Sequence, residues 1–183
     1  MIIEKAREVG AIVIVDEAYH YFYQHTFLPL IKEYDNVVIF RTFSKLFSLA
    51  AVRLGMMIAN EELIGYARKS MPSFEVNAVA LKFGEHMMQH TEIIDELMNA
   101  EAEGKAYLVE ELSKRGYETY TSHGNFVFIT PKRPVAEVAQ RLRDRKILIK
   151  TYGNEFLKNY VRISTGSKKA MKYLLDAFLE ADN

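Results

Sequence analysis

Residues 11–45 read AIVIVDEAYHYFYQHTFLPLIKEYDNVVIFRTFSK, and this stretch decides the fold class. It holds two short runs, AIVIV at 11–15 and VVIF at 37–40, in which every residue is apolar. A strand that is covered by helices on both faces has this composition, as in a parallel sheet. The segment between the runs is long enough for a crossover connection with a short helix. The stretch therefore predicts two parallel strands of an α/β sheet.

The remaining sequence predicts a third buried strand, a long helix and then a compact α+β unit. The third strand is expected at 54–59, and a helical pattern runs from about Phe74 to Arg115. Short strands and two further helices follow, and we expect the strands at 117–121, 125–130, 147–150 and 160–164 and the helices at 135–145 and 168–179. We expect a domain boundary near the Pro72-Ser73 turn or within the long helix, and we assign 1–72 and 73–183 to separate domains.

The bulk composition excludes several classes of protein. The 183 residues include 24 basic and 24 acidic residues, which provides no field for attracting nucleic acid or an anionic membrane. Cysteine is absent, so disulfides and thiolate metal sites are excluded and a cytoplasmic location is expected. No run is long enough to span a membrane. The opening MIIEKAREVG has the pattern of a helix ending at Gly10, and we expect a further part of the fold upstream of it.

Two oppositely charged residues follow the first two predicted strands. In open α/β sheets ligands lie outside the carboxyl ends of the strands, and Asp16 and Lys45 occupy such positions. A desolvated carboxylate needs a cation or several donors, and a protonated pyridine nitrogen would satisfy it. A poorly solvated lysine loses its proton more readily, and its neutral amine can form a Schiff base with an aldehyde. Tyr19 lies three residues after Asp16, where its hydroxyl could donate to a ring oxygen.

Hydroxyl groups and a guanidinium surround the lysine in sequence. Thr42 and Ser44 precede it, and Arg53 follows eight residues later. Two hydroxyls and one permanent positive charge suit a bound phosphate dianion. This part of the sequence predicts a phosphate-binding turn.

Four segments, VDEAYHYF, RTFSKLFSLAAVRLG, HGNFVFI and YVRISTG, occur in this order. Together they resemble the successive signatures of fold-type-I aminotransferases that use pyridoxal 5'-phosphate (PLP), most closely those of the histidinol-phosphate type. The resemblance implies an α/β large PLP-binding domain, of which only the C-terminal part is present, followed by an α+β small domain. It also implies that Lys45 is catalytic and binds the cofactor, and it gives roles to six further residues. Asp16 would pair with the pyridine nitrogen, Tyr19 with the phenolic oxygen, Ser44 and Arg53 with the phosphate, Thr42 would be a further phosphate ligand, and Arg162 would bind the substrate carboxylate.

The same resemblance implies an amino-acid biosynthetic enzyme that exchanges an amino group between an amino acid or phosphorylated amine and a 2-oxo acid, as a homodimer. Ser48 and Ala51 depart from the pattern, because the family usually has glycine at both places. The upstream half of the family's active site has no counterpart in these residues. We therefore expect the chain by itself to bind PLP weakly and to be inactive.

Alternative interpretations remain open. The same pocket serves decarboxylases of phosphorylated amino acids, and the chain could instead be a non-catalytic fragment. A distant alternative is a nucleotide hydrolase, in which Asp16 and Glu17 would serve magnesium. His86 and His90 have a helical metal-binding spacing, but no third ligand is evident, so no metal is expected.

Overall fold

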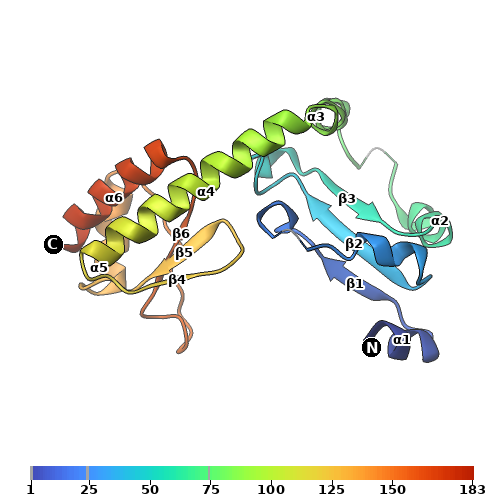
Figure 1. The fold of residues 1–183 in the computed structure, drawn as a ribbon, viewed down its shortest axis with the longest axis horizontal. Coiled ribbons are helices and arrows are strands. Elements are labelled where there is room, and N and C mark those ends of the chain that lie inside the picture. The colour runs from blue at the N-terminus through green and yellow to red at the C-terminus, as the bar shows by residue number, and fades with distance from the viewer. Residues whose placement is uncertain (1, 24, 74) are drawn as a thin grey trace. The chain divides into compact units, whose positions relative to one another are not determined.

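The computed structural model describes residues 2–23, 25–73 and 75–183. The chain divides into two compact units, 1–95 and 96–183 (Figure 1). The α/β class is confirmed by the mixture of helices and strands. The expected boundary at 72/73 stays a prediction about independent folding, and the predicted helix start at Phe74 lies outside the described residues.

The first unit is built on a three-stranded sheet in the order β1-β2-β3. Strands β1 (Val13–Asp16) and β2 (Val37–Thr42) are parallel, as expected, with Val13 opposite Val37. The other elements of this unit are α1 (Ile2–Glu8), the 3-10 turns η1 (His20–Phe22), η2 (Leu28–Lys32) and η3 (Ala50–Val52), β3 (Gly55–Ile58), α2 (Glu61–Ser70) and α3 (Ala78–Gln89). Helix α4 (Thr91–Lys114) begins in the first unit and continues into the second.

Strand β3, for which the sequence predicted a buried strand without a direction, is antiparallel to β2. The connection at 43–54 contains only the short η3 turn. A parallel return requires a crossover that carries the chain back along the sheet, usually through a helix. This loop instead reverses the chain, and it brings Thr42 opposite Gly55.

One face of this sheet carries a small core, and the other is partly exposed. Ile3 of α1 packs with Val37 and Ile39, and the neighbouring apolar residues come from β1, η2 and β3. On the opposite face Ile14 is 63% exposed and Phe40 is 39% exposed. Val38, on the same face as these two residues, is 3% exposed. The expectation that both strands are covered on both faces therefore holds at the centre of β2 and is wrong at Ile14 and Phe40.

The predicted long helix is interrupted at His90. Helix α3 ends at Gln89, and His90 has φ −115° and ψ 70°, outside the helical region. The His90 Nδ1 atom lies 2.7 Å from Glu92 Oε1, in the first turn of α4. This local contact stabilises the break, which apolar periodicity alone does not reveal.

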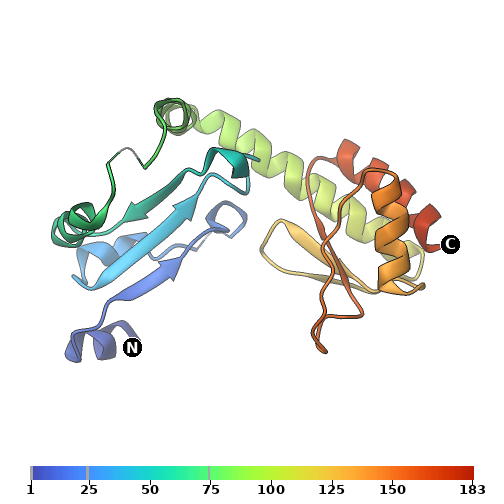
Figure 2. The ribbon, with the colours of Figure 1, turned by 180° about the vertical axis from the view of Figure 1, so that it is seen from behind.

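The second unit has three antiparallel strands and a helical layer on one face. They are β4 (Thr119–Thr121), β5 (Phe126–Ile129) and β6 (Val161–Ser164), in the order β4-β5-β6. Helices α5 (Val135–Asp144) and α6 (Lys168–Asp182) pack against each other (Figure 2). The core joins α4, β5, β6, α5 and α6, and it includes Leu108, Leu112, Val127, Ile129, Val138, Leu142, Val161, Ile163, Leu175 and Phe178.

Two predicted elements of this unit differ in extent. The 147–150 segment forms no strand and contributes a single bridge between Lys150 and Arg162. Helix α6 extends three residues past the expected end at Leu179. Its last residue, Asp182, is 3% exposed and accepts hydrogen bonds from the backbone N–H groups of Lys132 and Arg133 at 2.9 and 2.8 Å. A tertiary contact therefore sets the end of this helix.

Within the described residues, no helix combines the length and the apolar character required to cross a membrane.

Candidate active site

The ends of β1 and β2 bring the predicted cofactor residues to one edge of the first sheet. The strands are parallel, and Asp16 lies opposite Phe40, so their carboxyl ends face the same way. Asp16 is exposed, and its Oδ1 accepts a hydrogen bond from the Ala18 N–H at 2.9 Å. A pocket of about 200 Å³ opens at this end of β1, lined by Val15, Asp16, Glu17, Tyr19, His20, Tyr23, His25 and Phe27.

Lys45 and Tyr19 lie close together at this edge. The Lys45 ammonium lies 5.5 Å from the centroid of the Tyr19 ring. Lys45 is half-buried, and the residues around it in sequence, Phe43, Leu46 and Phe47, are buried. Because these apolar neighbours are anchored, the lysine is held at the surface of a packed loop. The structure thus brings together two residues that the sequence places 26 positions apart.

Thr42 shapes the turn that precedes the lysine. Its hydroxyl accepts a hydrogen bond from the Ser44 N–H at 3.1 Å, and it lies 3.5 Å from the Leu54 carbonyl oxygen. The Ser48 N–H donates to the Lys45 carbonyl oxygen at 3.1 Å and closes the next turn. The Ser44 side chain is half-buried beside this turn. These bonds define the backbone from which Ser44 and Lys45 project.

Arg53 ends the same loop in an unusual conformation. Its φ is 58° and its ψ 37°, in the left-handed region, and its Nη1 donates to the Ala50 carbonyl oxygen at 2.8 Å. Ser48 is the other positive-φ residue of this loop, at φ 54°. Residues other than glycine rarely adopt this backbone conformation, and holding one there costs roughly 1–3 kcal/mol of stability. The backbone of the loop is therefore strained at two positions, Ser48 and Arg53.

Replacing Ser48 with glycine is expected to stabilise the first unit by about 1 kcal/mol, because glycine adopts positive φ without a steric cost. Ala51 provides a matched control. It is also exposed and also stands where glycine would resemble the family, but it lies in η3 and is absent from the positive-φ residues of the described chain. Ala51→Gly is expected to destabilise the unit by about 0.5–1 kcal/mol, through the entropy of the unfolded chain. Urea unfolding of both variants measures the difference, and equal signs for the two would contradict the assigned strain.

Glu17, which lines this pocket, is held in a buried hydrogen-bonded network. It is 8% exposed, its Oε1 accepts from the Phe27 N–H at 2.7 Å, and its Oε2 accepts from Arg41 Nε at 3.0 Å. Burial opposes the charge, but these bonds, together with the Thr26 hydroxyl, hold the pKa of Glu17 below its ordinary value. Burial and the nearby Arg41 charge lower the pKa of His20. The network is therefore a carboxylate–guanidinium pair beside a neutral imidazole.

In the second unit, Arg162 lies among aromatic rings. Residues alternate along β6, so Val161 and Ile163 face the core while Arg162 faces away from it. Its guanidinium carbon is 5.1 Å from the centroid of the Phe126 ring, and its Nε is buried with no hydrogen-bond partner among the described residues. A buried N–H donor that lacks an acceptor is costly, and an anion would satisfy it.

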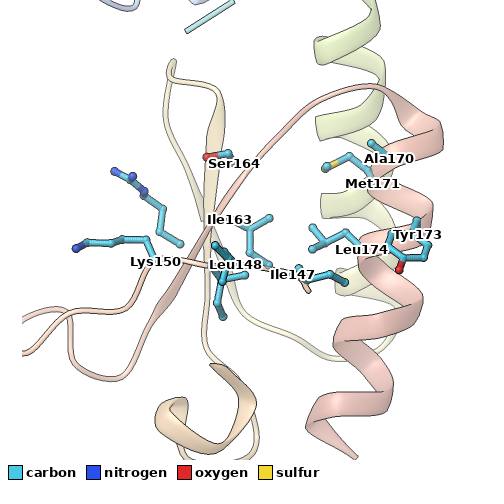
Figure 3. Close-up of a pocket in the computed structure, with 11 residues that line it drawn as sticks. Ile147, Leu148, Lys150, Ile163, Ser164, Ala170, Met171, Tyr173 and Leu174 are labelled. Atoms are coloured by element: carbon cyan, nitrogen blue, oxygen red, sulfur yellow. The ribbon is translucent and has the colours of Figure 1, made fainter. Parts of the chain in front are cut away.

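Lys150 adds a second cation beside Arg162. Each backbone N–H of the pair donates to the other's carbonyl oxygen, at 3.1 and 2.8 Å. Both residues line a pocket of about 470 Å³ whose opposite side is apolar. Figure 3 shows Lys150 extending away from α6, while Ile163 and Met171 lie between the strand and the helix. Two like charges on opposite residues repel each other unless an anion lies near them.

Sequence patterns identify the residues at the strand ends but miss two features. The pattern at 147–150 predicts only a strand, and the pairing of Lys150 with Arg162 depends on a single bridge that no periodicity predicts. Arg41 has no role in the sequence-based prediction, although a charged residue in an apolar strand is a signal for a buried partner. His86 and His90, whose spacing in sequence suits a metal site, have ring centroids 4.2 Å apart. No group of three or more possible metal ligands occurs among the described residues.

Comparison with known proteins places these observations in a family. The model of the family "Aminotransferase class I and II" matches residues 1–178. A curated histidinol-phosphate aminotransferase of Geobacter sp. (strain M21) is 36% identical over 180 residues, which cover 98% of this chain and 51% of the relative. The chain thus spans about half the length of the curated relatives it matches.

Solved structures show the same fold. Histidinol-phosphate aminotransferase from Sinorhizobium meliloti, in complex with pyridoxal-5'-phosphate, has a TM-score of 0.80 and 24% identity, over 93% of this chain and 48% of that one. L-threonine-O-3-phosphate decarboxylase from Porphyromonas gingivalis has a TM-score of 0.73 and 21% identity, over 91% of this chain and 55% of that one. The family match over nearly the whole chain and the identity of the curated relative lead to one conclusion: this chain belongs to the class I and II aminotransferase family.

Proposed function

We propose that this chain supplies the lysine-bearing half of a PLP-dependent aminotransferase of the histidinol-phosphate type. The observation that carries the proposal is the position of the Lys45 ammonium over the Tyr19 ring, at the ends of two parallel strands of which the first ends in Asp16. An amine, a phenol and a carboxylate are the groups needed around a pyridine aldehyde. Among the described residues, Lys45 takes part in none of the ion pairs, and its ammonium lies over the Tyr19 ring.

Each of these side chains has a distinct task in the proposal. The Asp16 carboxylate would keep a proton on the pyridine nitrogen, and its Oδ1 accepts a hydrogen bond from the Ala18 N–H. The Tyr19 hydroxyl would donate to the phenolic oxygen. Lys45 would hold the cofactor at its aldehyde and would carry the proton of the substrate α-carbon. The cofactor supplies a ring that accepts the electrons left on that carbon.

The residues of the turn around Lys45 are proposed to bind the cofactor phosphate. The Thr42 and Ser44 hydroxyls and the Arg53 guanidinium come from the two ends of one loop, between β2 and β3. Arg53 carries a permanent charge and a fork of donors that suits a phosphate dianion.

Arg162 is proposed to bind the substrate carboxylate. Its buried Nε has no acceptor in the described part of the chain, and the guanidinium is held over Phe126, which limits its orientations. A bidentate carboxylate would accept from the N–H groups of this guanidinium. The substrates are accordingly an amino acid or phosphorylated amine and a 2-oxo acid.

Further proposals concern the whole protein. Residues 1–72 are assigned to the C-terminal portion of a large PLP-binding domain, and 73–183 to the small domain. The proposed assembly is a homodimer in the cytoplasm, which agrees with the lack of cysteine. The decarboxylase with the same fold supports a second candidate reaction, loss of carbon dioxide from a phosphorylated amino acid.

Incubation of the chain with PLP, followed by borohydride reduction and peptide mass analysis, tests the assignment. We expect substoichiometric labelling with Lys45 as the principal site, because the chain spans about half the length of the curated relatives it matches. Labelling spread evenly over exposed lysines would overturn the function, and tight stoichiometric labelling would show that these residues form a sufficient pocket. In the complete protein, product analysis separates amine exchange from release of carbon dioxide.

A further inference from the structure

Three segments of the first unit meet at one buried ion pair. Glu17 directly follows the end of β1, Arg41 lies in β2, and Thr26 precedes η2. Arg41 Nη2 lies 2.9 Å from Glu17 Oε2 and 2.9 Å from the Thr26 hydroxyl oxygen. That hydroxyl lies 2.9 Å from both carboxylate oxygens of Glu17. The three side chains therefore form a closed set of hydrogen bonds.

The pair lies immediately next to the proposed cofactor residues in both segments. Asp16 directly precedes Glu17, and Tyr19 comes two residues after it. Thr42 directly follows Arg41 and leads into the turn that bears Lys45. Alternation along a strand turns neighbouring side chains to opposite faces. Glu17 is accordingly buried while Asp16 is exposed. Glu17 and Arg41, which bond to each other, thus belong to the same two segments as the proposed cofactor residues.

Two other contacts join these segments, a backbone hydrogen bond and a ring contact. The Glu17 N–H donates to the Phe40 carbonyl oxygen at 2.8 Å and continues the β1–β2 pairing by one residue. Tyr21 and Phe47 meet edge to face, with ring centroids 5.2 Å apart. Ring contacts tolerate sliding and rotation, whereas a forked guanidinium fixes both distance and angle. Of these side-chain contacts, the ion pair is therefore the one able to set the angle between the two segments beyond the backbone pairing of the strands.

The energetics favour a role in geometry over one in stability. Two side chains that are 7% and 12% exposed lose most of their hydration, and this cost offsets much of their attraction. An apolar pair of similar volume would hold a fold equally well. What an apolar pair lacks is direction, and catalytic side chains must be held within a fraction of an ångström.

From these contacts we propose that Glu17 and Arg41 are a positioning pair, which orients the Asp16–Tyr19 segment against the turn that carries Lys45. In this proposal the pair acts on PLP through these neighbours. The proposal rests on the proposed function for its consequence in cofactor binding. Its structural part, the coupling of two segments, stands on the contacts alone.

The double variant Glu17→Gln with Arg41→Met tests the pair. The glutamine oxygen still accepts from Thr26 and Phe27, so the 17–27 loop keeps its own bonds, and no buried charge remains alone. Only the bridge to β2 is removed. A matched control is Glu85→Gln with Lys82→Met, which removes an ion pair of the same charges that is 61% and 83% exposed.

The first readout is the selectivity of borohydride-trapped PLP for Lys45 over the exposed Lys32, measured well below the unfolding midpoint of each protein. We expect the selectivity for Lys45 to fall about tenfold in the double variant, because a reacting amine that is displaced from its productive position reacts more slowly. The selectivity should be unchanged in the control. Selectivity retained in a folded double variant would overturn the proposal, because a merely structural pair would leave it unaffected.

The second readout is free of cofactor. Hydrogen exchange of the backbone amides at 16–23 and 42–48 is expected to accelerate together in the double variant, while β4–β6 remain unchanged. Unchanged exchange in both segments would overturn the coupling itself. If the unmodified protein shows no preference for Lys45, the proposed function fails, and the exchange measurement still decides the coupling.

Should the double variant unfold, Arg41→Lys provides the same comparison. The ammonium keeps the charge opposite Glu17 but lacks the fork that reaches both Glu17 and Thr26. Reduced selectivity for Lys45 supports the proposal, and full selectivity contradicts it.

Discussion

Replacing Lys45 with alanine is expected to abolish borohydride-stable attachment of PLP at this position, and to lower transamination by the complete protein by about 10⁴-fold or more. The variant loses both the amine that holds the aldehyde and the group that moves the substrate proton. Stability should change by no more than about 1 kcal/mol, because the substitution removes a half-buried side chain whose ammonium packs on the Tyr19 ring. Mass analysis of the reduced protein and thermal unfolding measure the two effects.

Lys32→Ala is the control for this experiment, since Lys32 is an exposed lysine of the same unit. It should leave both labelling and turnover unaltered. A Lys45→Ala protein with full turnover would show that another residue performs the chemistry, and the assignment of the site would be wrong.

Replacing Gly104 with alanine is expected to destabilise the second unit by about 3 kcal/mol. A Cβ at this position of α4 would overlap the Gly166 carbonyl oxygen and would lie 2.7 Å from the Ser167 carbonyl carbon. Both atoms belong to backbone, so no side chain can rotate away. The intrinsic helix preference for alanine is worth only about 1 kcal/mol, too little to offset this overlap.

Gly65→Ala provides the matched control, because Gly65 lies inside α2 and an added Cβ would meet nothing within 4 Å. This variant is expected to be more stable than the unmodified protein by about 0.5–1 kcal/mol. Urea unfolding followed by circular dichroism compares the two. A Gly104→Ala protein as stable as the unmodified chain would contradict the close approach of the turn after β6 to α4.

Patterns confined to neighbouring residues were sufficient for most elements. The two apolar runs at 11–15 and 37–40 became β1 and β2, and the helix expected at 135–145 became α5. Elements whose ends depend on distant groups were less predictable. The carboxylate of Asp182 extends α6 through its bonds to the 132–133 backbone, and these partners are 49 and 50 residues away in sequence.

The candidate site divides in the same way. Asp16 and Lys45 could be identified because each follows a strand whose apolar composition is visible in the sequence. The buried partners of Glu17 could not, because Thr26 and Arg41 lie 9 and 24 residues from it, and only the paired strands reveal that they converge. The position of Lys150 beside Arg162 could not be predicted either, because a single β-bridge joins the two residues.

Local composition and the order of short motifs were enough to establish the α/β class, the parallel pairing of the first two strands, the family and the residue types available for PLP chemistry. Four features became visible in the folded chain alone: β3 runs antiparallel, Lys45 lies over Tyr19, Ser48 adopts positive φ, and Glu17 joins Arg41. The physical reason is that such contacts arise from the path of the chain through space, where residues distant in sequence compete for the same buried donors, acceptors and volume.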